Sequence, residues 1–141
     1  MLDEQAVTAS CLCGTIRITA KTPSKHLGAC HCNMCRTWGG GPLLAIECGA
    51  EVSIDGAERV TVYDSSAWAE RGFCSRCGSH LFYRLKGNQH YAIPAGLFDE
   101  DPAATFDHQV FIDEKPAYYS FVNKTSDMTG AEVFAKYGDQ T

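Results

Sequence analysis

Three cysteines lie within six residues, in the run Cys30-His31-Cys32-Asn33-Met34-Cys35. Unpaired thiols held so close together would crowd one another and oxidise, and a bound soft cation removes that problem. Two further segments, Cys11-Leu12-Cys13 and Cys74-Ser75-Arg76-Cys77, supply four more closely spaced thiols. The spacing therefore predicts two zinc sites, with the remainder of the chain serving as the scaffold that holds them.

The amino terminus favours a reducing compartment. The first five residues include the acidic Asp3 and Glu4 and no apolar run follows them, so we expect neither a signal peptide nor a transmembrane segment. A cytoplasmic protein keeps its thiols reduced, and close cysteine spacings then indicate metal binding or catalysis before disulfides. The eight cysteines are accordingly interpreted as metal ligands or free thiols.

Length and charge limit the domain count and the partners. A chain of 141 residues with 45% apolar side chains fits one domain, residues 1–141, that buries its own core. The formal charge is -5, and lysine and arginine are scattered without a basic stripe. We expect no nucleic-acid partner and no membrane partner, and the sequence leaves the oligomeric state open.

Short β-type runs separated by turn residues predict a mainly β fold. An extended backbone at 11–13 would point both sulfurs to one face and Leu12 toward the core, with Gly14 allowing the chain to turn away. A capping-box spacing from Thr129 to Glu132 predicts one short helix near the carboxyl end, over 133–137, ended by Gly138. The runs expected as strands are 15–19, 43–46, 51–54, 59–63, 80–85, 90–93, 109–112 and 117–122.

Trp38 and three consecutive glycines, Gly39-Gly40-Gly41, follow the central cysteine run directly. Glycines permit a flexible loop or the close approach of a ligand to the backbone, in which case Trp38 would form a binding wall. A simple turn with a packed tryptophan fits the same pattern equally well.

The clustered thiols can be grouped in two ways. Cys32 and Cys35 with Cys74 and Cys77 would form a zinc ribbon with a long insert, leaving three clustered thiols without a role. The other grouping uses all seven thiols. It forms a closed site from Cys11, Cys13, Cys74 and Cys77, and a three-thiolate site with an open position from Cys30, Cys32 and Cys35.

The order of these motifs resembles the glutathione-dependent formaldehyde-activating enzyme family. The resemblance lies in Cys-x-Cys-Gly, then Cys-His-Cys-x-x-Cys, then Phe73-Cys74-x-x-Cys77-Gly78-Ser79, and runs from about residue 10 to residue 121. It implies a β-tent of antiparallel sheets and two zinc sites. The structural ligands would be Cys11, Cys13, Cys74 and Cys77, and the ligands of the second, catalytic zinc would be Cys30, Cys32 and Cys35. The family's named reaction joins formaldehyde and glutathione to S-(hydroxymethyl)glutathione and is classed, in reverse, as a carbon-sulfur lyase.

The ligand set favours thiol activation. Zinc with three thiolates carries one net negative charge, so it polarises carbonyls poorly, yet it still deprotonates a thiol that enters the fourth position. The expected partner is a small thiol such as glutathione, acting as nucleophile toward an electrophilic carbon. Arg36, Arg71 or Arg76 could offset substrate carboxylates, although a solvated surface arginine is the more ordinary interpretation.

Other candidate residues have simpler interpretations. His31 lies between two ligands, but its ring would face away from both, which favours a supporting or surface role over ligation. Cys48 could be a fourth ligand of the second site, although a buried free cysteine is common. His80, His90 and His108 are isolated in the sequence, so no catalytic triad is predicted.

Two function classes are compatible with these motifs. The first is an enzyme that handles a small thiol adduct. The second is a zinc-stabilised binding module, because a domain of the same family also occurs in the chromatin-associated centromere protein V, and a fold does not determine a function. The acidic charge disfavours nucleic acid, while Trp38 and the glycines beside an open metal position favour a small ligand.

Overall fold

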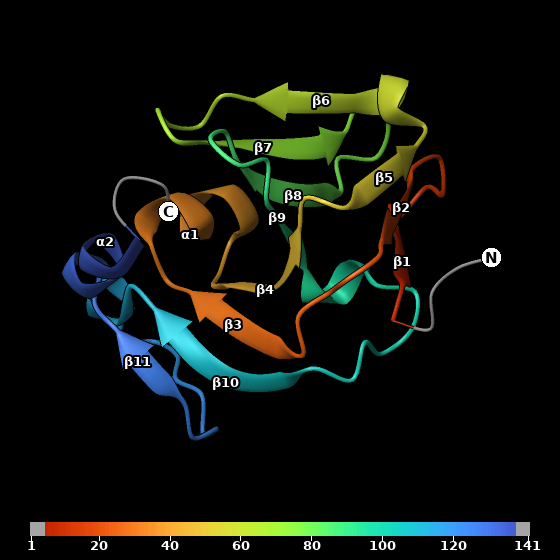
Figure 1. Ribbon diagram of the computed structural model, residues 1–141. Helices are drawn as coiled ribbons and strands as arrows, with labels where there is room; N and C mark the ends of the chain where they lie inside the picture. Colours follow the sequence, from red (N-terminus) through yellow and green to blue (C-terminus); the bar gives the residue numbers. More distant parts are fainter. Residues whose placement is uncertain (1–4, 138–141) are drawn as a thin grey trace.

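The computed structural model describes residues 5–137, which form two β-sheets (Figure 1). The smaller sheet is antiparallel, in the order β1 (Val7–Ser10), β2 (Arg17–Ala20) and β5 (Val52–Asp55). Burial alternates along β2, where Ile18 and Ala20 are buried and Arg17 is exposed, as the two-residue period of a strand requires. This sheet therefore presents one apolar face to the interior.

The larger sheet has eight strands in the order β11-β10-β3-β4-β9-β8-β7-β6. Neighbours are antiparallel except at β10, which pairs in parallel with both β3 and β11, so the expected antiparallel sheet is in fact mixed. The mainly β fold is confirmed. The strands are β3 (His26–Cys30), β4 (Leu43–Gly49), β6 (Val60–Tyr63), β7 (Ala69–Cys74), β8 (His80–Leu85), β9 (Tyr91–Pro94), β10 (Thr105–Val110) and β11 (Ser126–Met128).

The core is formed by the apolar faces of both sheets. Its largest fully buried apolar side chains are Ile18 within β2, Ile16 just before β2, and Ile46, Leu81 and Ile93 from the large sheet. A bridge between Ala9 and Phe98 joins β1 to the segment after the short helix η2 (Ala95–Leu97). The other short 3-10 helices are η1 (Ala57–Arg59) and η3 (Ile112–Glu114).

The large sheet bends, and helix α1 (Asn33–Gly39) lies between its two ends (Figure 1). The register shifts within the β4–β9, β7–β8 and β3–β10 pairs, and such irregularities bend a sheet locally. α1 follows β3 directly, yet its Trp38 ring lies 5.7 Å from that of Phe73 on β7 and 4.9 Å from that of His80 on β8. The helix thereby brings the cysteine run against strands that are distant in the sequence.

Helix α2 (Gly130–Tyr137) confirms the predicted short helix at the carboxyl end. Its capping box is reciprocal: the backbone N–H of Glu132 donates to the Thr129 hydroxyl at 3.1 Å, and the Thr129 N–H donates to a Glu132 carboxylate oxygen at 2.9 Å. The predicted helix stop, Gly138, lies outside the described residues.

Helix α1 was not predicted, because seven residues give little periodicity and cysteine is not a usual N-cap. The Cys32 sulfur caps it by accepting the N–H of Cys35 at 3.4 Å, and Gly40 ends it at a φ of 86°. Trp38 and Gly39 therefore belong to a helix and not to a loop. Strands β1, β3, β7 and β11 were also missed. The strand expected at 117–122 is wrong, since that segment is irregular.

The turn that carries the first two cysteines also differs from expectation. It closes through a hydrogen bond from the Gly14 N–H to the Cys11 carbonyl at 3.0 Å, so the backbone is not extended there. Leu12 is 89% exposed and does not face the core. Gly14 has a φ of 78°, and glycine adopts this left-handed conformation without strain.

Candidate metal centres and the family of the chain

Four cysteine sulfurs from two distant turns meet at the edge of the core. Cys11 and Cys13 come from the turn after β1, Cys74 ends β7, and Cys77 lies in the turn before β8. All four sulfurs lie within 4.8 Å of one another; Cys11 and Cys13 are 3.6 Å apart, and Cys13 and Cys74 are 3.8 Å apart. Sulfurs at the corners of a zinc tetrahedron lie about 3.8 Å apart, given zinc–sulfur bonds of about 2.3 Å. The cluster fits a four-thiolate zinc.

Neutral donors surround this first cluster. The N–H of Ile16 donates to Cys11 at 3.2 Å, and the N–H groups of Arg76 and Cys77 donate to Cys74 at 3.4 and 3.5 Å. Hydrogen bonding to Ser79, 3.2 Å from the sulfur, lowers the pKa of Cys77 to about 5. Such contacts stabilise the ionised sulfur that a metal requires.

The second cluster forms at the junction of β3 and α1. Cys30 ends β3, Cys32 caps α1, and Cys35 lies buried in the first turn of the helix, with the three sulfurs within 4.8 Å of one another. Hydrogen bonds from Cys30 and Cys35 lower the pKa of Cys32 to about 2, whereas the crowding sulfurs of Cys32 and Cys35 raise the pKa of Cys30. Without a metal, the three-cysteine cluster therefore favours one thiolate and disfavours a second or third. A cation is what would let all three ionise.

A family model, "Glutathione-dependent formaldehyde-activating enzyme", matches residues 6–114, which include both clusters. The chain belongs to this family. A protein of Schizosaccharomyces pombe named as an uncharacterized lyase is 42% identical over 125 residues, 88% of this chain and 91% of the relative. A Halomonas elongata protein, "Putative glutathione-dependent formaldehyde-activating enzyme", is 27% identical over 94% of this chain and 88% of its own length.

A solved structure supports the fold of this family member. The crystal structure of a Rhodobacter sphaeroides protein superposes with a TM-score of 0.57, covering 65% of this chain and 87% of the other at 22% identity. At that identity the likeness concerns the fold alone. The resemblance to the formaldehyde-activating family that the sequence motifs indicated is confirmed, as is the β-rich architecture that it implied.

The grouping of the thiols follows the second of the two partitions considered for the sequence. Cys32 and Cys35 do not join Cys74 and Cys77, which lie instead with Cys11 and Cys13. Cys48 belongs to neither cluster: it is fully buried, its sulfur contacts the Ile46 carbonyl at 3.4 Å, and burial raises the pKa of its thiol to about 12. Its position fits a packed core thiol and not a fourth ligand.

His31 is buried, and both of its ring nitrogens have partners. Nδ1 lies 2.7 Å from the Tyr119 hydroxyl, and Nε2 lies 2.7 Å from Gln109 Oε1. Gln109 donates through its nitrogen to Thr125, so its oxygen faces the imidazole and accepts the Nε2 proton. Burial lowers the pKa of His31. The predicted supporting position fits this geometry, and a surface position does not.

Sequence reasoning missed Gln109 and Tyr119, the two partners of His31. Neither residue belongs to a recognisable motif, and both lie far from the cysteine run in the sequence. Gln109 is 5% exposed on β10, so a glutamine within a predicted strand was the one signal that could have drawn attention to it.

The three arginines proposed from the sequence have different surroundings. Arg36 donates to the His31 carbonyl at 2.9 Å, and Arg76 donates to the Thr15 hydroxyl at 3.3 Å beside the first cluster. Arg71 is 3% exposed, and its Nη2 lies 3.6 Å from the Cys35 sulfur. Arg71 alone among the three contacts the second cluster directly through its guanidinium.

Among residues 5–137, none of the other three candidate histidines joins a candidate metal cluster. His80 is half-buried against Trp38, His108 bonds Asp107 at 2.8 Å, and His90 is exposed. The Trp38 ring also stacks on Tyr63 at 6.3 Å, which favours the packed interpretation of this tryptophan.

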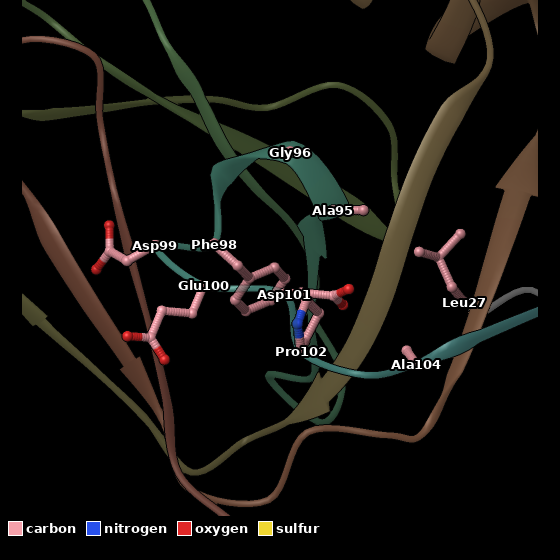
Figure 2. A pocket seen from close by; sticks show the side chains of 9 residues that line it. All are labelled: Leu27, Ala95, Gly96, Phe98, Asp99, Glu100, Asp101, Pro102 and Ala104. Carbon is pink, nitrogen blue, oxygen red and sulfur yellow. The ribbon is translucent and has the colours of Figure 1, made fainter.

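Two hollows accompany these features. One, of about 10 Å³, is bounded by Trp38, Arg71, His80 and Tyr83 and has room for no more than about one water. The other, of about 300 Å³, has Leu27 on one side and Asp99 and Glu100 on the opposite side (Figure 2), and none of the cysteines lines it. No helix within residues 5–137 has the length and apolar character needed to cross a membrane.

Proposed function

We propose that this chain is a zinc-dependent carbon-sulfur lyase acting on a small thiol adduct, in the direction of glutathione plus formaldehyde to S-(hydroxymethyl)glutathione or in a related reaction. The observation that carries the proposal is the separation of a three-cysteine cluster from a complete four-cysteine cluster. The family description, and relatives named as a lyase and as a putative formaldehyde-activating enzyme, support the same chemistry.

The two clusters would have different roles. Cys11, Cys13, Cys74 and Cys77 would hold a structural zinc with no vacancy, and Cys30, Cys32 and Cys35 would hold a second zinc with one open position. A zinc ion at the open site supplies the acidity that deprotonates an entering thiol. Cys30, Cys32 and Cys35 contribute three negative charges, which favour this role over carbonyl polarisation.

The bond changes of the reaction balance without a redox partner. The thiol sulfur forms a bond to the formaldehyde carbon, the electron pair of the carbonyl double bond moves to oxygen, and the proton lost by sulfur ends on that oxygen. His31 and α1 keep the cysteines in place during these changes, because His31 is fixed at both nitrogens and Cys35 is buried. The surroundings thus hold a preformed ligand set.

The test is an exchange measurement at equilibrium, because formaldehyde and thiols also combine unaided. NMR exchange spectroscopy on glutathione, formaldehyde and their adduct should show faster exchange with zinc-loaded protein. Cys32→Ser should lose the acceleration, and Cys48→Ala should keep it because Cys48 lies outside both clusters. Zinc-loaded protein that binds glutathione without accelerating exchange would support the alternative, a zinc-stabilised binding module. Protein that neither binds nor accelerates would contradict the proposed activity.

The domain and compartment assignments are part of the same proposal. We infer a single domain over residues 1–141 and a cytoplasmic location, because close cysteine spacings serve as metal sites where thiols stay reduced. Neither nucleic acid nor membrane is proposed as a partner, and the proposed partner is a small thiol.

A further inference from the structure

Arg71 is a buried cation without a carboxylate partner. It lies on β7 with 3% of its surface exposed, and none of the ion pairs among residues 5–137 includes it. A buried charge is strongly unfavourable unless it is paired. Some other group must therefore balance the Arg71 guanidinium.

The surroundings of Arg71 identify that group. Its one hydrogen-bonding side-chain partner among the described residues is Cys35, with Nη2 3.6 Å from the sulfur. The guanidinium carbon lies 5.9 Å from the Trp38 ring centre and 5.0 Å from the Tyr83 ring centre, so two aromatic faces hold it. The guanidinium is directed at the three-cysteine cluster and has little freedom to turn elsewhere.

The four-cysteine cluster has no equivalent contact within residues 5–137. Its sulfurs receive bonds from backbone N–H groups and lie beside the hydroxyls of Thr15 and Ser79. The nearby Arg76 directs its guanidinium to Thr15 and not to a sulfur. Among the described residues, only the three-cysteine cluster therefore receives a hydrogen bond from a charged side chain to one of its sulfurs.

The charge of Arg71 affects whether a thiolate can bind at the three-cysteine centre. Three thiolates around a divalent metal carry one net negative charge, and a fourth thiolate would have to approach that charge in a partly buried site. With Arg71 included, the centre is neutral, so an anionic sulfur enters without net repulsion. The hydrogen bond from the Arg71 guanidinium to the Cys35 sulfur also draws electron density from that thiolate, which weakens the donation of the sulfur to the metal.

We propose that Arg71 is a positioning residue that balances the charge of the centre at Cys30, Cys32 and Cys35 and so lets the anionic sulfur of a thiol substrate enter as the fourth ligand. This inference rests on the metal of the proposed function. It assigns Arg71 to the metal centre and not to the carboxylates of glutathione.

The experiment uses Co²⁺ as a spectroscopic probe and two thiols of different charge. Arg71→Met removes the charge at similar volume, and Arg71→Lys keeps the charge but loses the planar fork. Co²⁺ in Cys32→Ser gives the spectrum of the four-cysteine site, which is subtracted. In Arg71→Met the sulfur-to-cobalt charge-transfer band of the second site should move to longer wavelength, because Cys35 loses its donor. Arg71→Lys should move it less.

The two thiols distinguish the two roles of an arginine. Glutathione carries carboxylates and 2-mercaptoethanol carries none, while both supply a thiolate. The affinities of both should fall by about tenfold or more in Arg71→Met, by a similar factor, as expected for loss of an outer-shell partner. A loss confined to glutathione would overturn the inference, because it would assign Arg71 to carboxylate binding.

Arg84 is the matched control. It is also partly buried in the same sheet and stacks on Phe82 and Tyr91, but it pairs with Glu70 and contacts no cysteine among the described residues. Arg84→Met should leave the band and both affinities unchanged, even if the protein melts at a lower temperature. An unchanged band and unchanged affinities in both Arg71 variants would overturn the role proposed for Arg71 and leave the proposed function standing. Wild-type protein that binds no thiol at the metal would overturn the proposed function together with it.

Discussion

Nε2 of His31 and Oε1 of Gln109 lie 2.7 Å apart, although 78 positions separate the two residues in the chain. Gln109 continues to Thr125 at 2.8 Å, and Thr125 continues to Asp127 at 2.5 Å. This series of hydrogen bonds connects His31, which lies between the candidate ligands Cys30 and Cys32, to β10 and β11. It thereby ties the cysteine run to the carboxyl-terminal part of the fold.

We expect His31→Ala to lower the free energy of unfolding of the metal-loaded protein by about 3 kcal/mol, since it leaves a cavity and two unsatisfied polar groups. Denaturant unfolding followed by circular dichroism measures the change. His90→Ala, at an exposed position, is the control and should change stability little. Equal midpoints for the two variants would contradict a structural role for the buried imidazole.

Cys77→Ser should unfold or aggregate the protein. The first cluster joins the turn at Cys11 to the turn at Cys77, and much of the binding energy of a structural zinc site is folding energy. Substitutions of the other three cysteines, Cys11, Cys13 and Cys74, should act alike. Soluble yield and thermal melting are the measurements, and a cooperatively melting Cys77→Ser protein with the wild-type melting temperature would refute the assignment.

Mild chelation should remove about one zinc of two and leave the protein folded. The second cluster lies within one strand-to-helix junction, so its metal closes only short segments of chain, and its open position admits small chelators. Metal content and melting temperature, measured before and after chelation, test this. Simultaneous loss of both metals would show that the clusters do not differ as proposed.

Gly72→Ala should destabilise the protein by about 1 to 3 kcal/mol, as overpacking in a core does. A Cβ at this position on β7 would overlap the ring of Phe82, which is itself buried. Gly41→Ala is the control, since no atom lies within 4 Å of its Cβ and its φ is not in the left-handed region. Thermal melting of both variants should separate them; a Gly72→Ala protein as stable as Gly41→Ala would show that Phe82 can move aside.

The Glu132 carboxyl should titrate below its ordinary pKa of 4.5. The Thr129 N–H, and after it the Thr129 hydroxyl, lowers the pKa of this carboxyl by bonding its ionised form. Because the folded-state pKa is depressed, the stabilisation of α2 is complete above the ordinary value and declines as pH falls through the lower one. NMR titration of the Glu132 side chain measures this; a midpoint at or above 4.5 would contradict it.

Local sequence determined the features that depend on near neighbours. The spacing of seven cysteines indicated the family, because thiols two or three residues apart can share a metal wherever the chain goes next. The β-type run after the Cys77 turn predicted β8 with the bounds that the structure has, 80–85, and the capping box from Thr129 to Glu132 predicted α2. These signals depend on residues close together in the sequence, so the sequence alone is enough to recognise them.

Only the tertiary structure decided which distant groups meet. The choice between the two groupings of thiols depends on which turn comes near which, and that follows from the packing of the sheets rather than from spacing. The pairing of His31 with Gln109, and of Arg71 with Cys35, spans strands whose order in the sheet no local pattern specifies. α1 forms because the Cys32 sulfur caps it and Trp38 packs against β6, β7 and β8, so its stability comes from contacts that seven residues alone do not supply.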